Sequence, residues 1–163
     1  MRRSSLGSTA ARGLLIGLAA GAAGTTALNA VTYLDMTVRG RPASSTPERT
    51  AEKLADKVGI DIPGDEDARK NRLAGLGPLT GLFAGLGVGA ALGVARAFGF
   101  RPNMLVAAGL TGAAAMAGTD APMATLGVTD PRTWAVIDWF SDAVPHLAYG
   151  LVTAAVARGL DRG

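Results

Sequence analysis

Charged residues are absent from long stretches of this chain, and these stretches are apolar and rich in Ala and Gly. A helix rises about 1.5 Å per residue, so about 20 residues cross the ~30 Å hydrocarbon core of a bilayer. Four stretches are long enough, although the last contains Asp138, Asp142 and His146. The pattern predicts an all-α, polytopic membrane bundle that forms a single domain over residues 1–163. Its four predicted transmembrane helices cover residues 12–36, 72–98, 103–127 and 141–158.

The polar loop between the first two spans, residues 37–71, contains a helix signal of its own. Ser45 and Glu48 have the spacing of a capping box, Pro47 suits a first helical turn, and Gly59 is typical of a helix end. These residues predict a short amphipathic helix over residues 47–58. We expect it to lie on the membrane or on the bundle, and the alternative is a helix that binds a partner.

A second start signal precedes the last span. Asp130 and Pro131 resemble an N-cap followed by a proline in the first turn, and Trp134 and Trp139 come shortly afterwards. Because Trp favours the headgroup region, we predict an interfacial helix over residues 131–140.

Glycines recur every four residues in the first two spans, which places them on one face of each helix. Such rows let helix backbones approach closely in lipid, and they predict a glycine zipper. The helix-packing glycines are Gly13, Gly17, Gly21, Gly77, Gly81, Gly85, Gly89 and Gly93. A soluble bundle is the alternative, but Gly is about 1 kcal/mol less favourable than Ala in a helix in water.

An internal repeat links the two halves of the chain. Residues 21–30 align without gaps with residues 112–121, and residues 82–86 resemble residues 147–151. The sequence therefore predicts two tandem helix pairs. The repeat also favours retention of the first span, for which the alternative is a cleaved export signal.

Composition removes several classes of function. The chain has no Cys and one His, which excludes disulfides, cysteine catalysis and multi-His zinc sites. The net charge of +3 comes with arginines that flank the apolar runs, as expected for contacts with anionic headgroups. No basic patch with interleaved aromatic residues is present, so we expect no nucleic-acid partner.

Ionisable side chains inside predicted spans are costly and mark candidate functional sites. Asp142 and His146 lie four residues apart on one helical face, and Asp120 interrupts the third span. Together with nearby polar residues they predict an intramembrane cluster formed by Thr25, Asn29, Asp120, Asp142, His146 and Tyr149. Structural alternatives exist: Asp120 caps a short helix, Asp142 lies in the first turn of the last span, and His146 makes an interhelical hydrogen bond. No motif indicates a catalytic site, a cofactor or a metal.

Residues 17–21 (GLAAG) and 145–150 (PHLAYG), together with the repeated helix pair, resemble small uncharacterised four-helix membrane proteins of GC-rich actinobacteria and, distantly, the YagU-like inner-membrane family. The resemblance implies a multi-pass protein of the bacterial plasma membrane and a link to acid tolerance. An Arg to Lys ratio of 13 to 3 is typical of a GC-rich genome.

The sequence thus favours a non-enzymatic, glycine-zippered structural or assembly bundle. Its expected partners are the lipid bilayer and either a second copy of the chain or another membrane protein. The alternative is a small transporter, channel or proton-responsive protein that uses the Asp/His cluster. A third class is a membrane enzyme with Asp142 and His146 as its base pair.

Overall fold

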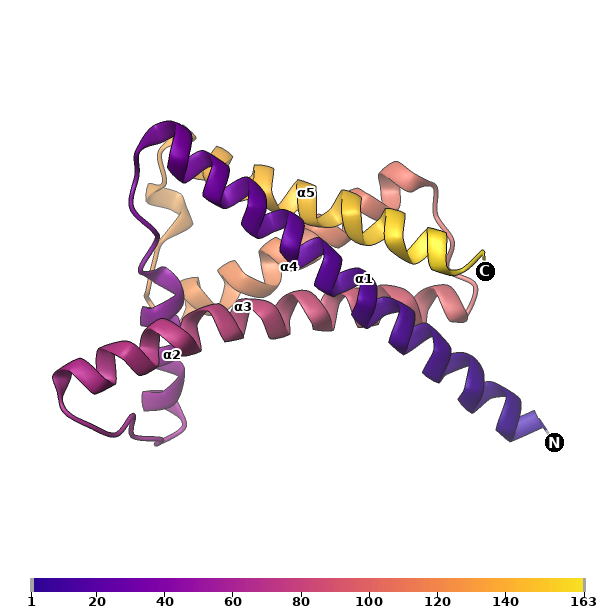
Figure 1. Ribbon diagram of the computed structural model, residues 1–163, viewed down its shortest axis with the longest axis horizontal. Coiled ribbons are helices and arrows are strands. Elements are labelled where there is room, and N and C mark those ends of the chain that lie inside the picture. Colours follow the sequence, from indigo (N-terminus) through magenta and orange to yellow (C-terminus); the bar gives the residue numbers. More distant parts are fainter. Residues whose placement is uncertain (1, 163) are drawn as a thin grey trace.

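The computed structural model describes residues 2–162, and within this range its regular elements are all helical (Figure 1). The helices are α1 (Arg2–Arg39), α2 (Thr46–Lys57), α3 (Glu66–Ala97), α4 (Met104–Thr125) and α5 (Val136–Leu160), with a short 3₁₀ turn, η1 (Pro131–Thr133), before α5. The all-α prediction is confirmed for these residues.

Three of the described helices, not four, are long and apolar enough to cross a membrane. They are α1 from Gly7 to Arg39, α3 and α4. The prediction of a fourth apolar span is wrong because α5 carries Asp138, Asp142, His146 and Arg158, and their polar groups lower its mean hydropathy.

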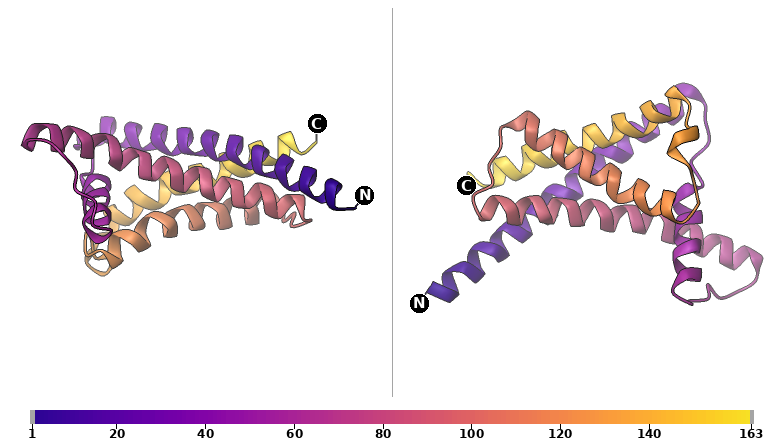
Figure 2. Two further views of the ribbon diagram at one scale, coloured as in Figure 1. Left: turned by 90° about the horizontal axis from the view of Figure 1, so that it is seen from below. Right: turned by 180° about the vertical axis from the view of Figure 1, so that it is seen from behind.

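The four long helices form one bundle. α1 packs along α3 on one side and α5 on the other, and α4 packs on α5 and, less extensively, on α3. α2 runs across one end of this bundle, nearly perpendicular to the long helices, and contacts α3 (Figures 1 and 2). α5 therefore follows the same axis as the apolar helices, which cover two of its sides.

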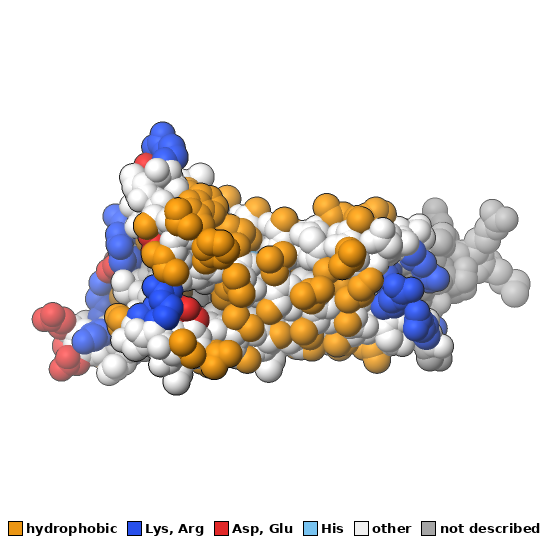
Figure 3. All heavy atoms as spheres, turned by 90° about the horizontal axis from the view of Figure 1, so that it is seen from above, with side chains coloured by type: hydrophobic (Ala, Val, Ile, Leu, Met, Phe, Trp, Pro, Cys, Tyr) orange, Lys and Arg blue, Asp and Glu red, His pale blue; other side chains and the backbone are white. Residues whose placement is uncertain are grey.

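The outer surface is arranged as a membrane protein requires. Hydrophobic side chains cover the middle of the face shown in Figure 3, and Lys and Arg side chains lie at both ends of it. Large apolar side chains such as Leu15, Phe83 and Leu105 are exposed on three different helices. Because water disfavours an apolar surface of this extent and lipid favours it, the band and the three apolar helices indicate a membrane protein.

The loop helix begins differently from the predicted capping box. Ser45 occupies the N-cap position of α2 but makes no side-chain cap bond, and the Thr46 amide donates instead to Ser44 Oγ at 3.2 Å. α2 buries Thr50 and Ala51. α2 ends at Lys57, and Gly59, two residues later, adopts a φ of +70°, which is typical of the residue that follows a helix end.

A separate interfacial helix over residues 131–140 does not form. Residues 131–133 make only η1, and α5 starts at Val136, where the amide of Ala135 donates to Asp138 Oδ2 at 2.9 Å. The carboxylate of Asp138 thus caps the new helix, and Asp142 lies a full turn inside α5 rather than in its first turn.

Candidate functional site

Close contact between α4 and α5 brings three ionisable side chains together. A Cβ atom at Gly112 would lie 2.7 Å from the carbonyl oxygen of His146, so only glycine lets α5 approach α4 this closely. The two helices are antiparallel. Asp120 lies two turns after Gly112 on α4, and Asp142 lies one turn before His146 on α5. The two Asp side chains therefore meet. α4 is continuous through Asp120, so this residue does not cap a helix.

His146 is held through both ring nitrogens. Nδ1 lies 2.8 Å from the carbonyl oxygen of Asp142 and 3.3 Å from its Oδ1, and Nε2 lies 3.4 Å from Thr119 Oγ1. The Thr119 hydroxyl donates to the carbonyl oxygen of Met116 at 3.0 Å, which leaves its lone pairs for Nε2. Nδ1 thus faces an acceptor, and Nε2 faces a hydroxyl that can accept from it or donate to it. The ring is buried, with 8% of the residue exposed.

The carboxyl groups of Asp120 and Asp142 are adjacent but incompletely satisfied. Asp120 Oδ1 and Asp142 Oδ2 are buried, and neither has a hydrogen-bond partner among residues 7–162. Two neighbouring carboxylates repel one another in an apolar site, whereas a proton on one turns it into a donor for the other. The arrangement can therefore hold a proton between the two carboxyls, next to the imidazole of His146.

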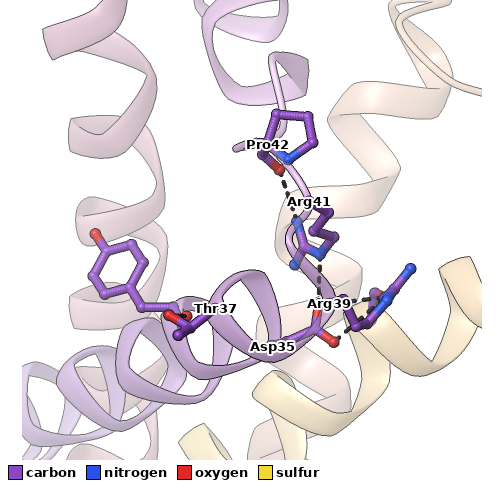
Figure 4. A network of polar contacts seen from close by, with 7 residues as sticks. Asp35, Thr37, Arg39, Arg41 and Pro42 are labelled. Carbon is purple, nitrogen blue, oxygen red and sulfur yellow. Dashed lines mark hydrogen bonds and ion pairs between the residues drawn. The ribbon is translucent and has the colours of Figure 1, made fainter.

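A second polar network fixes the end of α5 that carries this cluster. Asp35 near the end of α1 accepts hydrogen bonds from Arg41 Nε at 2.5 Å and from Arg39 Nη1 at 3.4 Å (Figure 4). Arg39 Nη1 also donates to Ser141 Oγ at 2.6 Å. Because Ser141 directly precedes Asp142, the network ties the first turns of α5 to α1.

The structure divides the six residues of the predicted cluster into three groups. Asp120, Asp142 and His146 lie together, and Thr25 and Tyr149 lie where α1, α3 and α5 meet. The Tyr149 hydroxyl donates to Gly85, and the Thr25 hydroxyl donates to the carbonyl oxygen of Gly21 at 2.9 Å.

Asn29 belongs to neither group, because it is exposed on α1. Thr119 was missed by the sequence reasoning, although a hydroxyl next to Asp120 in an apolar run was an available signal.

Glycines of α1 and α3 lie directly against one another. A Cβ atom at Gly21 would lie 2.6 Å from the carbonyl oxygen of Gly85, and one at Gly89 would lie 2.5 Å from the Cα of Gly21. A Cβ atom at Gly13 would lie 2.7 Å from the carbonyl oxygen of Gly93. The remaining two predicted packing glycines do not contact α1.

Gly77 lies against the start of α2, where a Cβ atom would come within 2.8 Å of the Glu48 amide nitrogen, and Gly81 has open space around it. Glycines also lie close together between α4 and α5: a Cβ at Gly150 would lie 2.8 Å from the amide nitrogen of Gly112.

The described residues contain no group of three or more His, Asp or Glu side chains placed to hold a metal ion.

Comparison of the chain with protein-family models, curated proteins and solved structures gives no significant match. The YagU-like resemblance stays a prediction, and the interpretation of the site depends on its geometry.

Proposed function

We propose that this chain is a non-enzymatic integral protein of the bacterial plasma membrane that takes up and releases a proton at Asp120, Asp142 and His146. One observation supports the proposal most directly: a carboxyl oxygen of each Asp is buried beside the other with no donor in the described chain. A proton satisfies both groups at once, and its loss leaves two like charges in contact.

The site has its own internal ion pair. α4 contributes Asp120 and Thr119 to the site, and α5 contributes Asp142 and His146. Among residues 7–162, the ion pair at this site is the one between His146 and Asp142, and the nearby Arg39 is bonded to Ser141 and Asp35. A proton gained or lost by one of these groups therefore changes the charge of a site in a low-dielectric environment, as expected for a proton-responsive element.

A change of charge at this site acts on the contact between α4 and α5. The two backbones pack closely at Gly112 and Gly150, two turns from Asp120 and Asp142, so a repulsion between these carboxylates acts on a tightly packed helix pair. We therefore propose that proton loss loosens this helix pair. The acid-tolerance link implied by the sequence resemblance agrees with such a response.

A structural or assembly role is the second candidate. It is favoured by the backbone contacts of Gly17 and Gly21 with Gly85 and Gly89, which make α1 and α3 a tightly packed pair. In this role the glycine-zippered bundle acts as a scaffold, and the Asp/His cluster keeps one fixed protonation state.

The single His of the chain makes the test specific. In the full-length protein in nanodiscs, ¹⁵N NMR reports protonation of His146 alone, and infrared spectroscopy reports the C=O band of a protonated carboxyl. We expect both signals to change between about pH 5 and about pH 8, the range in which imidazole titrates. Asp120→Asn should abolish the carboxyl band, and Asp142→Asn should shift the His146 titration.

Asp138→Asn is the matched control, because Asp138 is an exposed carboxylate one turn before Asp142 on the same helix. It should leave both titrations unchanged. A His146 signal and a carboxyl band that stay constant over this pH range in the wild-type protein would refute the proton-responsive role and favour the scaffold.

A further inference from the structure

The outward face of α1 carries one unsatisfied amide in a row of small and apolar side chains. Asn29 is exposed, and its side chain makes no hydrogen bond within the described part of the chain. Residues spaced three or four apart share one face of a helix. The exposed residues of this face are Ala11, Leu15, Ala19, Ala22, Thr26, Asn29 and Tyr33.

This face lies opposite the packed face of α1. Gly13, Gly17 and Gly21 contact α3, and Gly24 contacts α5. At 100° per residue, Asn29 points about 120° away from Gly17 and about 140° away from Gly24 around the helix axis. In Figure 1 α1 crosses in front of α3 and α5, and none of the described helices covers its near side.

Asn29 also lies at membrane depth. It is six residues from Asp35, the first charged residue beyond the run, which is about 9 Å of helix. Hydrocarbon chains cannot satisfy an amide, so an unpartnered Asn at this depth is unfavourable. The neighbouring Thr26 has no such need, because its hydroxyl donates to the carbonyl oxygen of Ala22 at 3.0 Å.

We propose that this face binds a second copy of the chain, with α1 packed on α1 and the two Asn29 amides hydrogen-bonded to each other. A carboxamide offers a donor and an acceptor, so two identical groups satisfy one another across a twofold axis. The small side chains of Ala19, Ala22 and Thr26 leave room for a close helix approach. The interface is independent of the Asp/His cluster, which faces the interior between α4 and α5.

Disulfide cross-linking tests the dimer directly because the chain has no Cys. Thr26→Cys and Tyr33→Cys place single thiols on the proposed interface, and Leu110→Cys places one on the exposed surface of α4. Under mild oxidation in native membranes, we expect covalent dimers from the two α1 variants and only background dimer from Leu110→Cys.

The role of the amide is tested in the Thr26→Cys background. Asn29→Leu should lower the apparent dimerisation constant by about tenfold, and this loss should appear as a smaller cross-linked fraction at limiting protein density. Asn29→Gln, which keeps the carboxamide, should retain most of it. Asn29 is exposed and makes no internal contact of its polar group, so the Leu variant should fold as the wild type does.

Three results would overturn the proposal. The first is equal cross-linking at Leu110 and at the α1 positions, and the second is no effect of Asn29→Leu. The third is a Thr26→Cys disulfide formed mainly with a different protein. Asp120→Asn serves as a separate control, since cross-linking should persist in that variant whether or not the site responds to protons.

Discussion

The hydroxyl of Tyr149 on α5 donates a hydrogen bond of 2.6 Å to the backbone carbonyl oxygen of Gly85 on α3. The Tyr149 side chain is fully buried. α1 makes room for its ring with Gly24, where a Cβ atom would lie 2.8 Å from Tyr149 Cδ2. One aromatic side chain thus joins three helices at a point where two of them present glycine.

Tyr149→Phe should weaken this junction by removing the donor alone. We expect a loss of about 0.5–1.5 kcal/mol in the free energy of unfolding, measured by denaturant titration in detergent. Tyr33→Phe is the matched control, because Tyr33 is 62% exposed and is the only other Tyr. Equal losses in both variants would show that the bond to Gly85 contributes nothing.

Gly87 and Gly89 are two residues apart on α3, but only Gly89 is packed against another helix. A methyl group at Gly89 meets the backbone of α1, whereas Gly87 has nothing within 4 Å. Gly89→Ala should therefore force α1 and α3 apart and cost about 1–3 kcal/mol. Gly87→Ala should leave stability unchanged or raise it by up to about 1 kcal/mol, because Ala favours the helix. Thermal unfolding of both variants in the same detergent measures these changes. An unchanged stability of Gly89→Ala would contradict the close packing of α1 on α3.

The ends of α3 and α5 are joined by a buried ion pair. Arg96 Nη2 lies 2.7 Å from Asp161 Oδ2, with side-chain exposures of 8% and 17%. Removing one partner leaves a buried charge, so Asp161→Asn should cost about 3–5 kcal/mol and increase hydrogen exchange in the last turns of α5. Arg158→Gln, at an exposed position on the same helix, should do neither. Adding Arg96→Gln to Asp161→Asn should recover part of the loss.

Cysteine labelling checks the direction of the helices in the membrane. Ser44 lies in the loop before α2 and Arg101 in the loop after α3, so single Cys residues there should react with an impermeant maleimide from opposite sides of intact cells. Arg162→Cys should label from the same side as Arg101→Cys, because the Arg96–Asp161 pair holds both ends together. Labelling of Ser44 and Arg101 from one side would exclude a spanning α3.

The turn before α5 should depend on pH in the acidic range. The guanidinium of Arg132 beside Asp130 lowers the pKa of this carboxyl below its usual 3.8. A lowered pKa in the folded state means that the ionised carboxylate favours the fold. Its contribution is therefore present above the ordinary pKa of Asp and is lost as the pH falls through the lowered value.

Asp130→Asn should remove this acid dependence. The indole N–H signal of Trp134, which donates to Thr129 Oγ1 at 2.8 Å, is a suitable NMR probe. An acid transition of that signal that persists in Asp130→Asn would assign it to another group.

Much of the helical organisation follows from the sequence because its causes are local. Uncharged runs of spanning length place α1, α3 and α4, and Gly59 marks the end of α2. The four-residue spacing of Asp142 and His146 puts them on one helical face by geometry alone. The polar character of α5 was also readable, although the prediction counted it as a fourth apolar span.

What only the tertiary structure decided is how each helix is rotated and which neighbour its faces meet. Thr25 and Asn29 are one turn apart in α1, yet one is half-buried against α3 and the other is exposed. Tyr149 follows His146 by three residues but reaches Gly85 rather than Asp120. Local spacing fixes the relation of side chains on one helix, whereas their partners depend on interhelical contacts such as those at Gly89 and Gly112, and these are settled by packing of the whole bundle.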